Sequence, residues 1–512
     1  MNRAIVGRFA FFSGLVFLVP GVGRSQQRMA PLPPDCSVSG SSSASAVKRA
    51  TVAASVAMLP LSIGAGAGPL AFLSDGLPNS IANRIAISVP RIFVVGRRVQ
   101  RRREPTNSAE VHSLGAELGA RYLLDGNISG KPGETRVTLA LYETTNGAQL
   151  WRRVYVYDSA GVLPLEQAAS LEVAARVAGS LTAGERQLLR RVPTSHHVAY
   201  EWALRGDAET SDPARAAEAY RRASSVDDNY ADAFAHLAIA SATLLETGAV
   251  SRENVRTVQK ELRFAAARAI TIDSTSSLAW LAEARSRVLG GRSAVASSQA
   301  FERAAALDPG SPVVLREYGR TLALAGEREH AATILRRART LDPAQAEVLM
   351  TLGELALDDH RDAEACVLLN QAIYYDALLA PAWALRAQVR GRHDDLRFAW
   401  ADAETAVRLG NRFLGESSGA LVDLMARDTV RARERLQSLW EDVQARGAVG
   451  VREGRAIAVA LLATHQPKRA LDVLEAVRAT GPWYAATLRE SHFDAVRNEP
   501  RFRALASAQA GL

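Results

Sequence analysis

Lysine and aromatic residues are scarce in this sequence, and their scarcity limits what its positive charge implies. The 512 residues carry a formal net charge of +8, which ordinarily suggests nucleic acid or an acidic membrane surface as a partner. Lysine occurs at only four positions, so the excess is almost entirely arginine, a bias that base composition explains as readily as function. Only 6% of the residues are aromatic and 48% are hydrophobic, with alanine prominent, which suits packed helical hairpins.

Cysteine is equally rare, since Cys36 and Cys366 are the only two. Cys36 lacks the small apolar residues that precede a lipidated bacterial cysteine, which argues against a lipid anchor. Cys366 lies beside Ala365 in a predicted helix, where a lone cysteine usually serves packing. A disulfide between the two is an open alternative in an oxidising compartment, although their spacing gives it no support.

The first 25 residues have the composition of a secretory signal. Arg3 and Arg8 precede an apolar core of about a dozen residues, which small residues follow. We expect cleavage after Ser25 and export to the periplasm or cell envelope. The apolar run is short for a spanning helix and Pro20 interrupts it, so retention as an inner-membrane anchor is the alternative. Residues 26–50 are rich in proline and serine and predict a tether.

A repeated triplet marks the second half of the chain. An alanine stands five positions before each proline site of the triplet, and a small residue at a constant position allows two helices to pack closely. The residue three positions before that alanine lies on the same stripe of the helix. The triplets recur at a spacing of about 34 residues: Leu307-Asp308-Pro309, Leu341-Asp342-Pro343 and Tyr375-Asp376-Ala377. The seam of these predicted helix pairs consists of Phe301, Ala304, Leu335, Ala338, Leu369, Ala372, Ala403 and Ala406.

The same register extends in both directions, and about eight units run from residue 197 to residue 484. An insertion near Leu245 to Val258 explains a slip in phase between the first units. Residues 485–512 would form a capping segment. The chain is therefore expected to contain an all-α solenoid over more than half of its length.

Single positions distinguish the units. Gly319 and Gly353 allow two helices to approach closely, whereas Arg386 and Arg390 depart from the pattern and predict a looser unit. The whole pattern resembles the tetratricopeptide repeat family. That resemblance implies helix pairs stacked into a right-handed superhelix whose inner face binds peptides or proteins.

Between residues 51 and 182 the hydrophobic period changes. Apolar and β-type runs predict strands at 52–61, 91–95, 122–129, 135–143 and 149–157. Helices are predicted at 72–87 and 108–118. Asn146-Gly147 predicts a tight hairpin between the last two strands, and Pro132-Gly133 marks the turn before them. The order is βαβαβββ, closed by an amphipathic helix that carries Leu165, Ala169, Val173 and Val177.

The segments MLPL, LSDGLPNSIANRIA, ELGARYLLDGNIS and RVTLALYETTNGAQLW resemble the small α/β domain related to the amino-terminal domain of the Tol-system protein TolB and to FlgO. Bacteria often fuse that domain to tetratricopeptide arrays, and its relatives accompany cyclase, kinase or winged-helix modules. The terminal HFDAVRNEPRFRAL resembles the closing segment of such fused proteins. Since a signal and a tether precede the domain here, we expect an exported stand-alone version.

The predicted fold is thus a small α/β domain followed by an all-α tetratricopeptide superhelical solenoid. Strand periodicity stops near Leu181 and the repeat register begins near His197. We expect the residues between them to be a short hinge or a continuous helix, with each side folding when expressed alone.

Two features of the α/β segment could carry chemistry but have simpler explanations. Gly64, Gly66 and Gly68 could cradle a phosphate, yet Pro69 stands where a helix should continue, so a surface loop is predicted. Asp75 could be catalytic, but a carboxylate in the first turn of a helix satisfies free amide donors and needs no partner.

The arginine-rich run at residues 97–103 could bind phosphate or lipid head groups, although no aromatic residues interleave with it. A solvated loop is the simpler interpretation, so no nucleic-acid partner is predicted. His196-His197 has no further ligands nearby in sequence for a metal site. We therefore expect no catalytic residues, no cofactor and no metal, and a protein that is not an enzyme.

By the same resemblance, the residues of the first helices that face the inner groove include Arg316, Arg320, Glu354 and Gln388. Arg316 and Arg320 are four residues apart, so they share a face that could meet an acidic peptide. The asparagines of the family's carboxylate clamp are absent at matching positions, and a solvated helix face is the favoured interpretation. Reversal of both charges should therefore leave the fold intact.

The leading hypothesis is a non-enzymatic scaffold of the bacterial cell envelope that binds partner proteins or peptides through the solenoid groove. The alternative is a regulatory or sensory protein whose α/β domain binds a small ligand and signals through the repeats. A third possibility, an enzyme, lacks a matching set of nucleophile, base and oxyanion donors.

Overall fold

The computed structural model describes residues 35–36, 54–64, 67, 70–95, 107–130, 135–157, 161–209, 212–251, 253–289, 294–324, 326–478, 488 and 491–507. The predicted signal, most of the tether, Gly66, Gly68, the turn at Pro132-Gly133 and the arginine run lie outside these ranges. Among the helices within them, none is both long and apolar enough to cross a bilayer.

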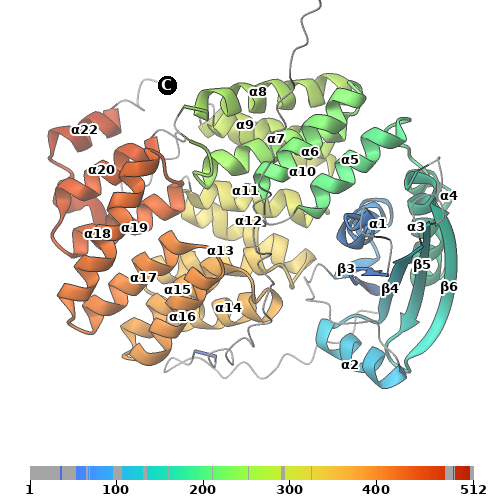
Figure 1. The fold of residues 1–512 in the computed structure, drawn as a ribbon, viewed down its shortest axis with the longest axis horizontal. Helices are drawn as coiled ribbons and strands as arrows, with labels where there is room; N and C mark the ends of the chain where they lie inside the picture. The colour runs from blue at the N-terminus through green and yellow to red at the C-terminus, as the bar shows by residue number, and fades with distance from the viewer. Residues whose placement is uncertain are drawn as a thin grey trace, which may run out of the picture. The chain divides into compact units, whose positions relative to one another are not determined.

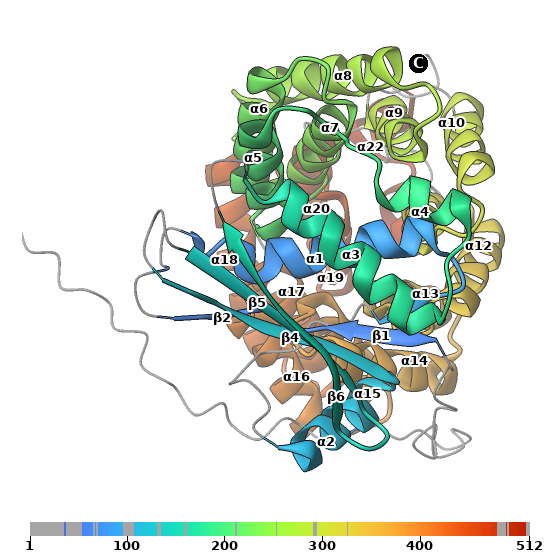
Figure 2. The ribbon, with the colours of Figure 1, turned by 90° about the vertical axis from the view of Figure 1, so that its right-hand side faces the viewer.

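A mixed sheet forms the first folded region (Figures 1 and 2). Its order is β3-β1-β4-β5-β6, with β3, β1 and β4 parallel and the remaining pairs antiparallel. β2 is a two-residue strand that pairs with β4 in parallel, just after the first predicted strand, and the sequence did not predict it. The strands are β1 Ser55–Met58, β2 Ser62–Ile63, β3 Phe93–Val95, β4 Tyr122–Ser129, β5 Thr135–Glu143 and β6 Ala148–Tyr157.

The predicted tight hairpin is confirmed, because Gly147 has a φ of 70° at the turn between β5 and β6. Its amide donates to the carbonyl of Glu143 at 2.9 Å. A left-handed backbone at this position is easy only for glycine, or for asparagine and aspartate.

Alternating side chains give the sheet two covered faces. Val56 and Leu124 join the cluster that includes α1 (Leu73–Ser88) and α3 (Leu163–Ala178). Their neighbours Ala57 and Leu123 join a second cluster, against α2 (Ser108–Leu118). The predicted residues of the closing helix, such as Val173, lie on the buried side of α3.

Helix pairs fill the chain after the sheet, in colours that run from green to red in Figure 1. The described residues contain eight such pairs, from α5–α6 to α19–α20. They are α5 His197–Ala208, α6 Pro213–Val226, α7 Ala231–Glu246, α8 Val255–Ile272, α9 Ser277–Leu289, α10 Ala294–Leu307, α11 Pro312–Leu324, α12 Arg328–Leu341, α13 Ala346–Asp358, α14 Asp362–Tyr375, α15 Ala380–Arg392, α16 Leu396–Arg408, α17 Arg412–Met425, α18 Thr429–Arg446, α19 Val451–Ala463 and α20 Pro467–Arg478. A 3-10 turn, η2 (Ser491–Val496), and α22 (Pro500–Ser507) follow.

The repeated small residues lie where the sequence placed them, in the seam of each pair. Ala304, Ala338, Ala372 and Ala406 are fully buried. A Cβ atom added to Gly319 on α11 would lie 2.5 Å from Cγ of Leu335 on α12, so this position holds two helices too close for any larger side chain. The 34-residue period therefore reflects one packing geometry that is used again in each unit.

The α/β region and the solenoid share one hydrophobic core, a contact that the sequence did not predict. A separate short helix, α4 (Ala183–Leu189), lies between them and is capped by Thr182 and Glu185. α1 packs against α5, and a Cβ atom added to Gly76 would lie 2.8 Å from the carbonyl of Leu204. Periodicity marks where one element type ends, but it does not report contacts between regions.

Two polar contacts of α1 lie at and beside this junction. Arg84 on α1 donates from Nε to the fully buried Glu166 of α3 at 2.7 Å. The hydroxyls of Ser80 and Tyr200 lie 2.8 Å apart, which joins α1 to α5. The first contact lies within the α/β region, between α1 and α3, and the second joins that region to the first repeat.

Candidate interaction face of the solenoid

The four residues predicted to face the groove all lie on first helices of their pairs. Arg316 and Arg320 lie on α11, Glu354 on α13 and Gln388 on α15. A separation of four residues places the two arginines on the same side of α11. The structure gives each of these four side chains a partner within the chain.

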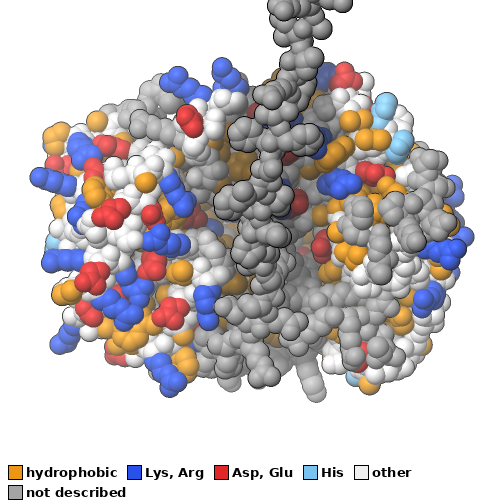
Figure 3. Space-filling model, in the orientation of Figure 1, with side chains coloured by type: hydrophobic (Ala, Val, Ile, Leu, Met, Phe, Trp, Pro, Cys, Tyr) orange, Lys and Arg blue, Asp and Glu red, His pale blue; other side chains and the backbone are white. Residues whose placement is uncertain are grey.

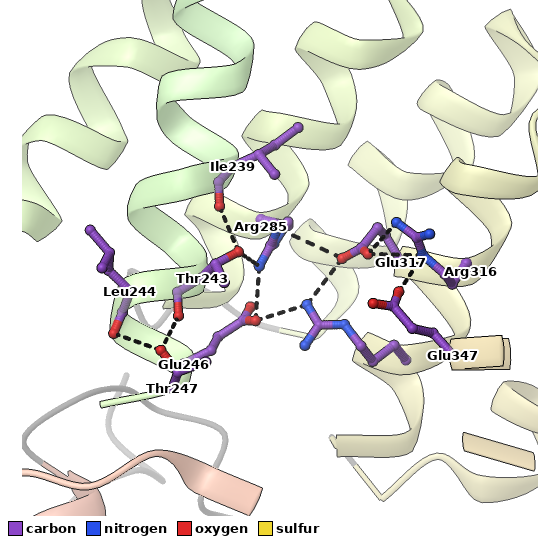
Figure 4. Close-up of polar contacts among 10 residues, drawn as sticks. Ile239, Thr243, Leu244, Glu246, Thr247, Arg285, Arg316, Glu317 and Glu347 are labelled. Carbon is purple, nitrogen blue, oxygen red and sulfur yellow. Dashed lines mark hydrogen bonds and ion pairs between the residues drawn. The ribbon is translucent and has the colours of Figure 1, made fainter. Parts of the chain in front are cut away.

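Four of the first helices, α7, α9, α11 and α13, are joined by a chain of ion pairs (Figure 4). Glu246, the last residue of α7, accepts at 2.8 Å from Arg285 of α9 and at 2.8 Å from Arg320 of α11. Glu317 of α11 then accepts from Arg320 at 3.0 Å, and it lies 3.7 Å from Arg285. We call Glu246, Arg285, Glu317 and Arg320 the inner network.

Arg316 continues this chain towards the solvent. Its guanidinium lies 3.2 Å from Glu317 and 3.1 Å from Glu347 of α13. The side chain of Arg316 is 26% exposed and that of Glu347 is 48% exposed, whereas the members of the inner network are more deeply buried. The accessible end of the chain is therefore the Arg316–Glu347 pair.

The buried carboxylate of Glu317 is held in its charged form. Burial alone would raise its pKa, but Arg320, Arg285 and Arg316 outweigh that effect and hold the pKa well below the ordinary value of 4.5. The pKa of Arg320 is raised in turn, because Glu246 and Glu317 outweigh the opposing effect of burial. The charges of the inner network thus stabilise one another in the folded chain.

The favoured interpretation of a solvated face is therefore wrong for Arg320, whereas Arg316 is partly exposed. Arg320 is bound between two acidic residues, and reversal of its charge would disrupt the fold. Glu354 accepts from Arg452 at 2.9 Å, and Gln388 donates to Ser418 at 3.0 Å. The sequence could not show this because the partners lie 74 residues away for Arg320 and 98 residues away for Glu354.

The last helix pair contacts earlier ones and supplies the partners of two acids on α13. Arg452 and Arg455 of α19 bind Glu354 and Asp358 of α13 at 2.9 and 3.0 Å. A Cβ atom added to Gly450 would lie 2.5 Å from the carbonyl of Glu246. The start of α19 therefore closes against α7 and α13.

A second buried cluster occupies the unit that was predicted to be looser. Arg386 is 1% exposed and donates from both Nε and Nη2 to Asp402 of α16 at 2.8 Å. Arg390 lies 3.0 Å from the same carboxylate. The prediction of a looser unit is wrong, because the two arginines are buried around a carboxylate of the second helix.

The segment predicted as a tether is bound to this cluster at Asp35 and Cys36. Cys36 forms a disulfide with Cys366 of α14, and its side chain is buried. Asn370, one helical turn after Cys366, binds the backbone of Cys36. The packing role assigned to a lone cysteine is wrong, since sequence spacing cannot report a contact between residues 330 positions apart.

The other candidate motifs have structural explanations where they are described. Gly64 donates its amide to Ile128 at 2.8 Å beside the sheet, and Asp75 lies in the first turn of α1. His196 and His197 lie at the start of α5. No group of three or more His, Cys, Asp or Glu residues that could hold a metal occurs within the described ranges.

Surface hollows on the described residues are shallow. One of about 230 Å³ lies between α16, α17 and α18 and includes Glu416 and Arg435. Another, of about 900 Å³, is wide open and runs along α4, past Arg186 and Arg190. Neither lies in the interior of the sheet region.

No protein-family description matches this chain, and no curated protein does. Among solved structures, it resembles the APC/C hetero-tetramer Cut9–Hcn1 with a TM-score of 0.41 and 13% identity, over 67% of this chain and 60% of that one. It resembles PilF of Pseudomonas aeruginosa with a TM-score of 0.33 and 20% identity, over 42% of this chain and 91% of that one. For YrrB, a TPR protein with an unusual peptide-binding site, the TM-score is 0.26 and the identity 15%, over 39% of this chain and 96% of that one.

All three TM-scores lie below 0.5. The assignment to a tetratricopeptide-like solenoid therefore rests on the helix pairs of this chain, their period and their buried alanines.

Proposed function

We propose that this protein is a non-enzymatic scaffold of the bacterial cell envelope that binds a partner protein or peptide on the inner face of its solenoid. The observation that carries the proposal is the partly exposed pair between Arg316 and Glu347, at the open end of an otherwise buried chain of charges. Partner binding at this position has an identifiable chemistry, which is the recognition of a carboxylate by a guanidinium.

An exposed ion pair is easily exchanged. Exposed ion pairs contribute about 0–1 kcal/mol to stability. Replacing the Glu347 carboxylate by that of a partner therefore costs the folded protein little free energy. Arg316 stays aligned during the exchange because its guanidinium is also bound to the buried Glu317. The arrangement favours an acidic segment as the partner.

Charge on the outer surface supports a protein partner over nucleic acid. On the face shown in Figure 3, basic and acidic side chains are interspersed over the C-terminal helices. Nucleic acid is instead bound by clustered Lys and Arg residues on one face.

Two observations support the proposed location. The basic and apolar start of the sequence is typical of a secretory signal. The disulfide between Cys36 and Cys366 is a bond that forms and persists in oxidising compartments such as the periplasm.

The test compares two charge reversals on partner binding. Arg316→Glu changes the inner face, and Arg336→Glu makes the same change on an exposed position of α12, the second helix of that pair. A partner captured with the wild-type protein from the producing organism should bind Arg316→Glu at least about tenfold more weakly by calorimetry, which is the loss of one charge-assisted contact. It should bind Arg336→Glu as it binds the wild type.

Equal affinities for the two variants would overturn the inner-face assignment. Tight binding to random DNA that weakens steeply with salt would favour a nucleic-acid function instead. Circular dichroism of both variants gives the control for folding.

A further inference from the structure

The amino-terminal segment contacts α14 through its backbone as well as through its disulfide. The amide of Cys36 donates to Oδ1 of Asn370 at 3.1 Å, and Nδ2 of Asn370 donates to the carbonyl of Cys36 at 2.9 Å. One amide side chain thus binds both polar groups of one residue. This two-point contact is how an extended peptide backbone is recognised independently of its side chain.

Asn370 is held in the orientation that this contact requires. Nη1 of Arg386 donates to Oδ1 of Asn370 at 3.0 Å. Arginine has only donors, so the atom that faces it must be the oxygen of the amide. That choice leaves the nitrogen of Asn370 directed at the carbonyl of Cys36. Arg386 is itself fixed by Asp402 and by the ring of Trp383, 4.7 Å away.

Charge around this contact selects an acidic segment. Arg386 and Arg390 are both buried, and among their acidic partners in the described residues Asp402 is buried while Asp35 and Asp395 are more exposed. Asp35, which precedes Cys36, lies 3.9 Å from Arg386 although its side chain is 83% exposed. An aspartate at this position adds negative charge where the cluster has an excess of positive charge.

We propose that Asn370 and Arg386 form a peptide clasp on α14 and α15, and that its occupant is the chain's own Asp35-Cys36 segment. The clasp is under thiol–disulfide control. A dithiol reductant converts the Cys36–Cys366 bond into two thiols and is itself oxidised to a disulfide, so two electrons and two protons pass to the cysteines. Among the described residues, the contacts that remain at the segment are the two amide hydrogen bonds, the attraction of Asp35 and the approach of Cys366 Sγ to the Cys36 carbonyl.

Hydrogen exchange of the full chain tests this directly. In the oxidised protein, the Cys36 amide should exchange slowly, and reduction should speed its exchange. In the reduced protein, Asn370→Ala should accelerate it by about a further tenfold or more, the effect of two lost hydrogen bonds. Gln371→Ala, at the next position on α14, is the matched control and should change nothing.

Equal exchange rates for reduced wild type and reduced Asn370→Ala would overturn the clasp. Asn370→Asp keeps the acceptor and loses the donor, so it should give an intermediate rate. Protection of the α14 amides in each variant shows whether the helix itself is intact.

A second measurement asks whether the site accepts the segment as a free peptide. A synthetic peptide with the sequence of residues 30–42 is supplied as its disulfide-linked dimer to the Cys36→Ser chain. The Cys366 thiolate attacks the dimer, forms a disulfide with one peptide and releases the other as a thiolate. Intact mass should show this adduct forming about tenfold more slowly when Asn370→Ala is added, and no more slowly with Gln371→Ala. Equal rates with both additions would reject the site.

Discussion

The two buried arginine clusters of the solenoid differ in how carboxylates compensate the positive charge of the arginines. In the inner network, Arg285 and Arg320 face Glu246 and Glu317, so the charges balance within the repeats. In the second cluster, Arg386 and Arg390 share one buried carboxylate, Asp402. There, the additional acidic groups, Asp35 and Asp395, are more exposed.

The pKa values of the central carboxyl groups shift in opposite directions in the two clusters. Three arginines hold the pKa of Glu317 below its ordinary value, whereas burial outweighs the hydrogen bonds from Arg386 and raises the pKa of Asp402. Burial also lowers the pKa of Arg390. In the inner network the charges stabilise one another, whereas in the second cluster burial destabilises the charged forms of Asp402 and Arg390.

The largest expected effect is therefore in the balanced network. Glu317→Gln should lower the free energy of unfolding by about 3–5 kcal/mol, because it leaves buried arginines without their counter-charge. Glu347→Gln, which removes an exposed partner of Arg316, should lower it by less than about 1 kcal/mol. Urea unfolding at neutral pH measures both free energies. Similar losses of stability for the two variants would show that the buried Glu317 contributes no more than the exposed Glu347.

Acid should weaken the inner network. The folded pKa of Glu317 lies below its unfolded one, so its contribution is present above the ordinary value of 4.5 and is lost as the pH falls through the folded pKa. The difference between wild type and Glu317→Gln should shrink accordingly when unfolding is measured at decreasing pH. A constant difference would contradict the charge argument.

A smaller effect is expected from the disulfide that serves the second cluster. Reduction, or Cys36→Ser, should lower the free energy of unfolding by about 2–4 kcal/mol, the typical contribution of a disulfide. The loss caused by Glu317→Gln should be the same in reduced and oxidised protein if the two clusters are independent. Unequal losses would show that the clusters are coupled.

The smallest effect is expected at the unbalanced carboxylate. Asp402→Asn should lower the free energy of unfolding by about 1–3 kcal/mol, the result of disturbed hydrogen bonds with Arg386 and not of a lost stabilising charge. The folded pKa of Asp402 lies above its unfolded one, so this group favours the folded state as the pH falls through the folded pKa, opposite in sign to Glu317. Asp395→Asn, at a more exposed partner of Arg390, is the control. If Asp402→Asn lowered the free energy of unfolding by more than Glu317→Gln does, the predicted order of the two clusters would be wrong.

Local pattern predicted most of the elements. Alternation and turn residues predicted the strands and the hairpin at Gly147, because these features depend on neighbours in sequence. The 34-residue period predicted the seam of buried alanines for the same reason, since each alanine belongs to the helix pair of its own repeat.

The sequence alone therefore determined the type and order of the elements and the packing within each helix pair. Only the tertiary structure decided which charges are buried, that α19 returns to α13, that α1 shares a core with α5, and that Cys36 meets Cys366. The physical reason is separation along the chain. Periodicity reports which side of a helix is buried, but the partner of a buried charge or thiol is set by contacts between elements far apart in sequence.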